Sequence, residues 1–373
     1  HRWLETITKF KATISPAPNF AFDMCTTRIT EAQKANIDLS TIKVWSCGAE
    51  PVRFETLRSF TEAFAKQGAS LSQFSPSYGL AEATLAVSMD GPSTRKTTRS
   101  FKRDEMRAGG RAVPVGSDDP RGDVFVGCGR PLIGQDVRIL HSESSRSMPA
   151  FEIGEICVSG KNVARGYWNR PDVTASVFGF ETEGRQFLKT GDLGFIDDRG
   201  ILFVVGRIKE MIIVRGRNYY PHDLEDTCRA ADLRLAKSVS AAFAVETEKG
   251  EGVVIVQEAP IGLSTDDLVA VGNACRGRIS DEFELQVLDI RFVPPGGVPR
   301  TSSGKIRRGQ ARVLYSKDSL AAYDLRPLAA IRSAVTARMQ LATFKTHVFA
   351  RIALSRARSI LPLSKRVSVS ISR

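Results

Sequence analysis

One lysine near the end of the chain, Lys305, lies among small and polar residues in PRTSSGKIRR, residues 299–308. A glycine-rich loop that ends in lysine can bind phosphate, and the P-loop pattern is G-x-x-x-x-G-K-[ST]. Pro299 stands where that pattern needs its first glycine, and Ile306 stands where a hydroxyl would bind magnesium. The P-loop is therefore excluded. A lysine on a flexible loop can instead bring a point charge to an oxygen that becomes more negative in a transition state.

Three further stretches combine glycine with polar side chains, as a close approach of backbone to ligand requires. They are SYGLAEAT (77–84), LKTGDLGFIDDRG (188–200) and GRIKEMIIVRGRNYYPHDLE (206–225). Each alone has an ordinary explanation, because Gly-Asp-Leu is common in turns, a lone tyrosine is often a core residue and a lone glutamate is often solvated. Their occurrence together, in this order and spacing, indicates a functional site.

Together with GAEPV (48–52) and RGYWNRPDVTASVF (165–178), these stretches resemble the adenylate-forming superfamily of acyl-CoA synthetases, luciferases and peptide-synthetase adenylation domains. Within it, the chain is most similar to fatty acyl-AMP ligases, over nearly all of residues 1–315. The resemblance implies that a fatty carboxylate attacks the α-phosphate of ATP, which releases pyrophosphate and leaves an acyl-adenylate. Such chemistry needs positioning and charge neutralisation rather than a protein nucleophile.

The resemblance also implies a nucleotide site built from several of these stretches. Tyr78 and Gly79, with the turn Gly48-Ala49-Glu50, correspond to the wall beside the adenine. Asp192 would accept hydrogen bonds from both ribose hydroxyls, and Arg207 would add a ribose or phosphate contact.

Glu82 would hold Mg²⁺, a hard cation that prefers carboxylate oxygen. Lys305 would be catalytic, delivered by a small mobile domain onto a nucleotide bound elsewhere in the protein. Lys209 corresponds to the hinge about which that domain rotates between adenylation and thiol transfer. An exposed loop lysine is the ordinary alternative for Lys209, and a solvated surface lysine is the ordinary alternative for Lys305.

A polar, basic segment of about residues 90–127 is too long for an ordinary connection. Fatty acyl-AMP ligases differ from acyl-CoA synthetases by an insertion at this place, which restrains the domain motion and disfavours CoA. The expected acceptor is therefore the phosphopantetheine thiol of an acyl carrier protein, with a long-chain acyl-CoA synthetase that uses CoA as the alternative. The apolar stretch Phe20-Ala21-Phe22 is compatible with an acyl tunnel and equally with core packing.

The pattern of elements predicts an α/β fold in three parts. Residues 1–207 are expected to be the C-terminal portion of a large AMP-binding domain, with a parallel α/β layer and a small antiparallel β unit. Residues 208–315 are expected to form a small α+β lid domain. We expect an opening helix that ends at Ser15–Pro18 and an aromatic turn after it. We also expect strands at Ile42–Ser46 and Leu71–Phe74, and helices at about Pro221–Ala231 and Thr265–Phe283.

Residues 316–373 are expected to form a basic tail, because they hold 11 lysines and arginines against only Asp318 and Asp324. Helix-like spacing of apolar residues between Leu320 and Ile371 is compatible with a docked helix or with contact to an anionic membrane. Binding through this tail by a catalytically incomplete chain is thus a second, non-enzymatic hypothesis. The body of the chain has no concentrated basic face, which argues against nucleic acid.

Six scattered cysteines without a C-x-x-C pair indicate free thiols and a cytoplasmic protein. No apolar run is long enough to predict a membrane-spanning helix. The chain begins with His1, and the family's upstream Ser/Thr/Gly-rich phosphate loop does not precede residue 77. We therefore expect a fragment of a longer protein, with partial or no turnover by itself.

Overall fold

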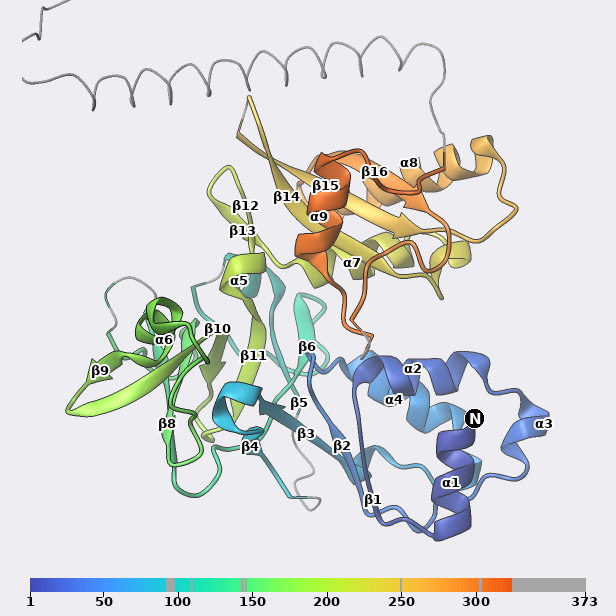
Figure 1. Ribbon diagram of the computed structural model, residues 1–373. Coiled ribbons are helices and arrows are strands. Elements are labelled where there is room, and N and C mark those ends of the chain that lie inside the picture. The colour runs from blue at the N-terminus through green and yellow to red at the C-terminus, as the bar shows by residue number, and fades with distance from the viewer. Residues whose placement is uncertain are drawn as a thin grey trace, which may run out of the picture. The chain divides into compact units, whose positions relative to one another are not determined.

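The first 91 residues alternate helices and strands, and their strands form a sheet in the order β1-β2-β3-β4. In the computed structural model (Figure 1), β1, β2 and β3 pair in parallel and β4 pairs antiparallel to β3. The expected parallel α/β layer is confirmed. The elements are α1 (Arg2–Phe10), β1 (Ile14–Ala17), α2 (Asn19–Arg28), α3 (Glu31–Lys34), β2 (Val44–Cys47), α4 (Phe54–Ala63), β3 (Phe74–Gly79) and β4 (Ala86–Met89).

Aromatic side chains from helices and strands form the core of this layer. Trp45 of β2 is fully buried, and Phe22 of α2 and Phe60 of α4 pack edge-on against it at ring-centroid distances of 5.8 and 5.5 Å. Leu57 and Phe60 lie three residues apart on α4, the spacing that places both side chains on one helix face. Because Phe22 is fully buried in this cluster, its role is core packing rather than lining of an acyl tunnel.

Two expectations for the start of the chain are wrong. The opening helix ends at Phe10, where Lys11 takes a left-handed conformation, and Ser15–Ala17 belongs to strand β1 instead of ending the helix. A strand can include Pro16 because β1 is at the edge of the sheet, where a missing N–H is tolerated. The expected aromatic turn is helix α2.

The expected strand at Leu71–Phe74 begins later than predicted. Leu71–Gln73 is a 3₁₀ turn, so strand β3 begins only at Phe74.

The segment after β4 includes a hairpin that packs on the antiparallel unit. It comprises β5 (Thr98–Lys102), α5 (Arg103–Ala108) and β6 (Gly122–Val126), with β5 and β6 antiparallel. Phe101 of β5 is fully buried and contacts Phe195 and Phe203 at ring-centroid distances of 5.0 and 5.4 Å. The described part of the expected insertion is therefore anchored to the body by an aromatic cluster.

The expected antiparallel β unit is confirmed, with the strand order β11-β10-β8-β7 and β9 paired to β10. Its core is aliphatic, and Ile156, Val158 and Leu188 are almost fully buried. The elements are β7 (Gln135–Leu140), β8 (Gly154–Gly160), α6 (Pro171–Phe178), β9 (Phe180–Thr182), β10 (Arg185–Ile196) and β11 (Leu202–Arg207).

Residues 208–323 contain a further sheet, β14-β15-β16, with helices packed on it. Buried Val254 and Val256 of β15 share a core with Phe243 of β14 and Ala311 of α9. The elements are β12 (Ile212–Val214), β13 (Arg217–Tyr219), α7 (Pro221–Ala230), β14 (Ser240–Thr247), β15 (Gly250–Glu258), α8 (Thr265–Phe283), β16 (Val287–Val293) and α9 (Arg308–Ser316).

The structure describes residues 1–91, 98–108, 110–141, 144, 146–248, 250–301 and 304–323. Of these, His1–Tyr323 form one compact unit. The expected domain boundaries at 207 and 315 stay predictions, and all but the first eight residues of the expected basic tail lie outside the described residues. Among the described helices, none is long and apolar enough to cross a membrane.

Candidate functional site

The structure brings together three of the predicted residues from three strands. Tyr78 of β3 donates its hydroxyl to Oδ2 of Asp192 over 2.8 Å, and Arg207 donates its Nε to Oδ1 of Asp192 over 2.9 Å. The Asp192 side chain is largely buried, whereas the Arg207 side chain is 56% exposed. A carboxylate has about four lone-pair positions, so Asp192 retains acceptor capacity for two further hydroxyl groups.

Strand pairing explains why Asp192 and Arg207 meet. Residues 192 and 207 are direct partners in the antiparallel pairing of β10 with β11, which places their side chains side by side. Thr190 fixes the turn before Asp192, because its hydroxyl accepts the Asp192 N–H over 3.1 Å and donates to Ile156 O over 2.7 Å. The register between β10 and β8 also shifts here, and such irregularities commonly aim a side chain at a site.

Burial raises the pKa of Asp192, and the bond from Tyr78 and the charge of Arg207 offset part of this effect. Burial also raises the pKa of Tyr78 well above its ordinary value, and the neighbouring Asp192 raises it further. The tyrosine hydroxyl therefore keeps its proton at neutral pH and acts as a donor.

Glu82 has a partner that the sequence reasoning missed. Tyr167 donates its hydroxyl to Oε1 of Glu82 over 2.6 Å, across 85 positions of sequence. Burial and this bond raise the pKa of Tyr167 to about 12, and the nearby charge of Arg207 lowers it slightly. The sequence does contain a signal for Tyr167, because this residue lies in RGYWNRPDVTASVF, one of the stretches that carry the family resemblance.

The surroundings of Glu82 fit a magnesium ion that arrives with phosphates. Tyr167 occupies Oε1, and no bond to Oε2 is found within the described residues. Nor does that part of the chain contain a cluster of three or more His, Cys, Asp or Glu side chains that could hold a metal. Mg²⁺ usually keeps several waters and binds through one or two carboxylates plus substrate phosphates. A single carboxylate from Glu82 is consistent with that mode.

The predicted adenine wall follows β2 and lies against β3. A Cβ atom at Gly48 would lie 2.6 Å from Ser77 O, so only glycine allows this approach of the two strands. Ala49 takes a positive φ of 69°, and Glu50 accepts the N–H of Phe20 over 3.0 Å. Gly79, the last residue of β3, pairs with Ala86.

Lys305 is exposed and lies close enough to Glu50 to affect its ionisation. Burial raises the pKa of Glu50, while the Phe20 N–H, Arg53 and Lys305 lower it. Gly304, before the lysine, has a φ of +86°, and a Cβ there would lie 3.0 Å from the Phe20 ring. The lysine loop, by which we mean the described residues 299–301 and 304–307, therefore lies against the start of α2, beside the predicted adenine wall.

Lys209 is exposed in a 3₁₀ turn, Ile208–Glu210, directly after β11. Its neighbour Glu210 accepts Nη1 of Arg308 over 2.6 Å, a link to the lysine loop that the sequence did not indicate. The predicted site residues thus lie in two groups. One holds Tyr78, Asp192 and Arg207 with Glu82 nearby, and the other holds Glu50 and Lys305.

An open hollow of about 820 Å³ lies elsewhere, on β7, β8, β10 and α6. Its rim includes Lys161, Arg165 and Arg185, but none of the predicted site residues lines it. The hollow is therefore separate from the two groups of predicted site residues.

Comparison with known proteins identifies the family. A family model described as AMP-binding enzyme matches residues 1–168. This part of the chain is an AMP-binding enzyme domain. Its fold is that of adenylate-forming enzymes: it superposes with a TM-score of 0.73 on a structure from a study of fatty acyl-adenylate ligases from E. coli and L. pneumophila. That pair is 33% identical, over 85% of this chain and 55% of the other.

Two curated relatives of this chain are named as fatty acid ligases. The medium-chain-fatty-acid–[acyl-carrier-protein] ligase JamA of Moorena producens (strain JHB) is 39% identical over 87% of this chain. The long-chain-fatty-acid–AMP ligase FadD26 of Mycobacterium tuberculosis (strain ATCC 25618 / H37Rv) is 36% identical, also over 87%. In both cases the chain spans 56% of the relative's length.

Proposed function

We propose that the protein is a fatty acyl-AMP ligase that activates a fatty acid with ATP and passes the acyl group to an acyl carrier protein. The observation that carries the proposal is the Tyr78–Asp192–Arg207 group, a buried carboxylate held by two donors at the junction of β3, β10 and β11. The printed names of JamA and FadD26 support the choice of a fatty acid as substrate.

The proposed roles follow from the chemistry of each group. Asp192 accepts the ribose hydroxyls, and Arg207 offers the rest of its exposed guanidinium to ribose or phosphate oxygen. Tyr78 and the turn Gly48–Glu50 bind the adenine. Lys305 holds its charge beside the oxygens that become more negative as the carboxylate attacks the α-phosphate and pyrophosphate leaves. Glu82 would hold Mg²⁺, which would supply positive charge to neutralise the phosphates.

The acceptor of the acyl group is the more specific part of the proposal. The hairpin of β5 and β6 with α5 stands where acyl-AMP ligases differ from CoA-using enzymes, and α5 lies against β13 of residues 208–323. This contact supports restraint of the domain motion that CoA transfer would need. An acyl carrier protein is therefore proposed over CoA, and Lys209 is proposed as the hinge.

Fatty-acid-dependent exchange of labelled pyrophosphate into ATP tests the adenylation step. We expect exchange when the chain is joined to the remaining half of a relative, as described below, and a loss of roughly 100-fold or more when that joined protein carries Lys305→Ala, because removal of one donor to a transition-state oxygen typically has that effect. Lys317→Ala, an exposed lysine just after α9, is the matched control and should retain exchange.

The chain spans about half the length of these relatives, so the assay is also run on a chimera that joins it to the remaining half of JamA. Failure of both proteins to activate any carboxylate would refute the enzyme proposal. Acyl transfer to CoA but not to a carrier protein would refute the proposed acceptor alone.

A further inference from the structure

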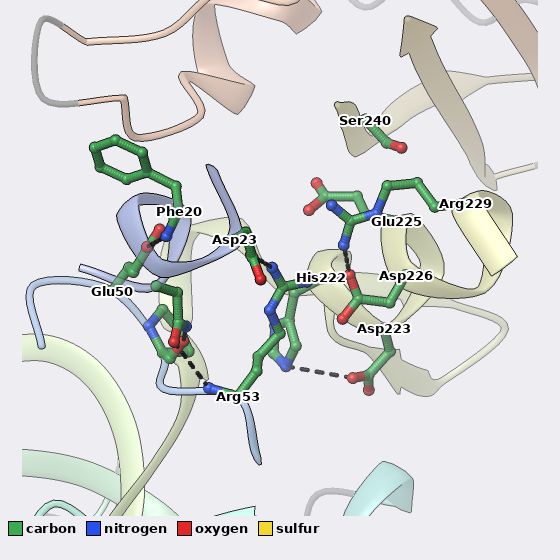
Figure 2. A network of polar contacts seen from close by, with 12 residues as sticks. Phe20, Asp23, Glu50, Arg53, His222, Asp223, Glu225, Asp226, Arg229 and Ser240 are labelled. Carbon is green, nitrogen blue, oxygen red and sulfur yellow. Dashed lines mark hydrogen bonds and ion pairs between the residues drawn. The ribbon is translucent and has the colours of Figure 1, made fainter. Parts of the chain in front are cut away.

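Helix α7 presents two neighbouring carboxylates to partners in different parts of the fold (Figure 2). Glu225 binds Arg308, at the start of α9, and Asp226 binds Arg53, just before α4. Figure 2 shows Glu225 and Asp226 on α7, with Arg229 beside Asp226. Arg308 lies three residues after Lys305, and Arg53 lies three residues after Glu50. The two carboxylates therefore pair with one arginine next to the lysine loop and one arginine next to the predicted adenine wall.

The Glu225–Arg308 pair is buried and bidentate. Arg308 donates Nε to Oε1 over 2.7 Å and Nη2 to Oε2 over 2.8 Å, and Nη1 reaches Glu210 over 2.6 Å. The Glu225 side chain is 4% exposed and that of Arg308 18% exposed. Glu225 also accepts the N–H of Ala242 over 2.9 Å. A fork of this kind fixes orientation as well as charge, so the start of α9 is held rigidly.

The lysine loop is closed at its base, next to Arg308. Arg307 N–H donates to Pro299 O over 2.9 Å, and Thr301 N–H donates to Lys305 O over 2.9 Å. Arg300, on the other side, donates to buried Glu258 over 2.7 Å. The loop thus has a charged anchor at each end. Holding Arg308 therefore sets where Lys305 can reach.

The Asp226–Arg53 pair, unlike the Glu225–Arg308 pair, is partly exposed to solvent. Arg53 donates Nη1 to Asp226 over 2.7 Å and Nη2 to Asp23 of α2 over 3.2 Å, and Arg229 also pairs with Asp226. The side chains of Arg53 and Asp226 are 33% and 39% exposed. Partly exposed ion pairs are weak and screened by salt, so this contact can open and re-form while the buried pair stays intact.

We propose that α7 positions Lys305: Glu225 holds the lysine loop through Arg308, and Asp226 sets it against the adenine wall through a reversible contact with Arg53. Arg308 and Arg53 are thus positioning residues that touch no substrate. Their relevance to catalysis rests on the proposed function. Their effect on the place and order of the loop does not, and can be measured without turnover.

Peptide-resolved amide hydrogen exchange tests the buried anchor. In Arg308→Ala, exchange at the described loop residues 299–301 and 304–307 should be roughly 10- to 100-fold faster, because the buried carboxylate loses its partner and the loop loses its anchor. Arg312→Ala removes an exposed arginine one turn further along α9 and should leave exchange unchanged. Arg308→Lys keeps the charge but loses the fork, so protection should be intermediate even if the alanine variant folds poorly.

Pulsed electron spin resonance tests the reversible contact. Spin labels at Lys66→Cys and Lys317→Cys, both exposed sites, report the distance between the α4 region and the end of α9. The native cysteines are buried and should stay unlabelled. We expect one narrow distance in the parent and a second, longer population in Arg53→Ala. Arg58→Ala, which removes two ion pairs within α4 only, is the control and should keep the single distance.

Unchanged loop exchange in both Arg308 variants, or an unchanged distance distribution in Arg53→Ala, would overturn the corresponding half of the proposal. Neither readout depends on pyrophosphate exchange, so failure of the enzyme proposal is recognised separately. High salt should reproduce the Arg53→Ala distribution in the parent, since it screens the exposed pair, and should leave loop exchange as it is.

Discussion

At the scale of single residues, the site depends on what surrounds each polar group. Asp192 is largely buried, yet both of its oxygens accept donors, one from Tyr78 and one from Arg207. Burial raises its pKa more than these donors lower it. The carboxylate is thus held in place while its ionisation stays sensitive to its surroundings, including any ligand that covers it.

A pH series of thermal melts tests this balance. Because folding raises the pKa of Asp192, its contribution to stability is full below the ordinary aspartate pKa of about 3.9 and is lost as pH rises through the raised value. The Tm of the wild type relative to that of Asp192→Asn should therefore fall as the pH rises above about 4.

Asp198→Asn is the matched control for that series. Bonds from Arg99 lower the pKa of Asp198, so its contribution is present above the ordinary aspartate pKa and is lost only as pH falls. The Tm of the wild type relative to that of Asp198→Asn should not fall over the same rise in pH. Parallel curves for the two variants would contradict the account of Asp192.

At the scale of elements, local patterns predict some parts well and others poorly. Helix α8 covers Thr265–Phe283 as expected, because Ser264 forms a capping box with Asp267 at its start. Strand β1 was missed because Pro16 argues locally for a break, and only pairing with β2 makes that stretch a strand. The hairpin of β5 and β6 lacked a clear apolar period, and its fixed position depends largely on Phe101.

Phe101→Ala tests that anchor. The side chain is fully buried and packs edge-on against the stacked rings of Phe195 and Phe203, so its removal should lower the free energy of unfolding by about 3–5 kcal/mol, measured by urea denaturation. Val124→Ala, on the partner strand β6 and 42% exposed, should change it by less than about 0.5 kcal/mol. Equal effects of the two variants would mean that the aromatic cluster does not anchor the hairpin.

At the scale of the whole molecule, the thiols report how well the described unit is packed. All six cysteines are free and buried, as the sequence predicted for unpaired thiols. Burial raises the pKa of Cys25 to about 11 and those of Cys128 and Cys157 to about 12, so few of these thiols are ionised at neutral pH.

Thiol titration with an aromatic disulfide checks this packing. The native chain should react slowly and with less than one equivalent, and the denatured chain should release all six thiols. Rapid reaction of several thiols in the native chain would show that the cores around β2, β8 and α7 open on the time scale of the assay.

The sequence by itself determined the α/β class and helices such as α7 and α8, and it proposed the residues of the candidate site. Glycine-bounded motifs and apolar periods are local, so they can be recognised without a fold. Tertiary structure alone decided that Tyr167 binds Glu82 and that α7 links Arg308 with Arg53. These partners are 83 to 173 positions apart, and no local pattern specifies which charges the packing of sheets and helices will bring together.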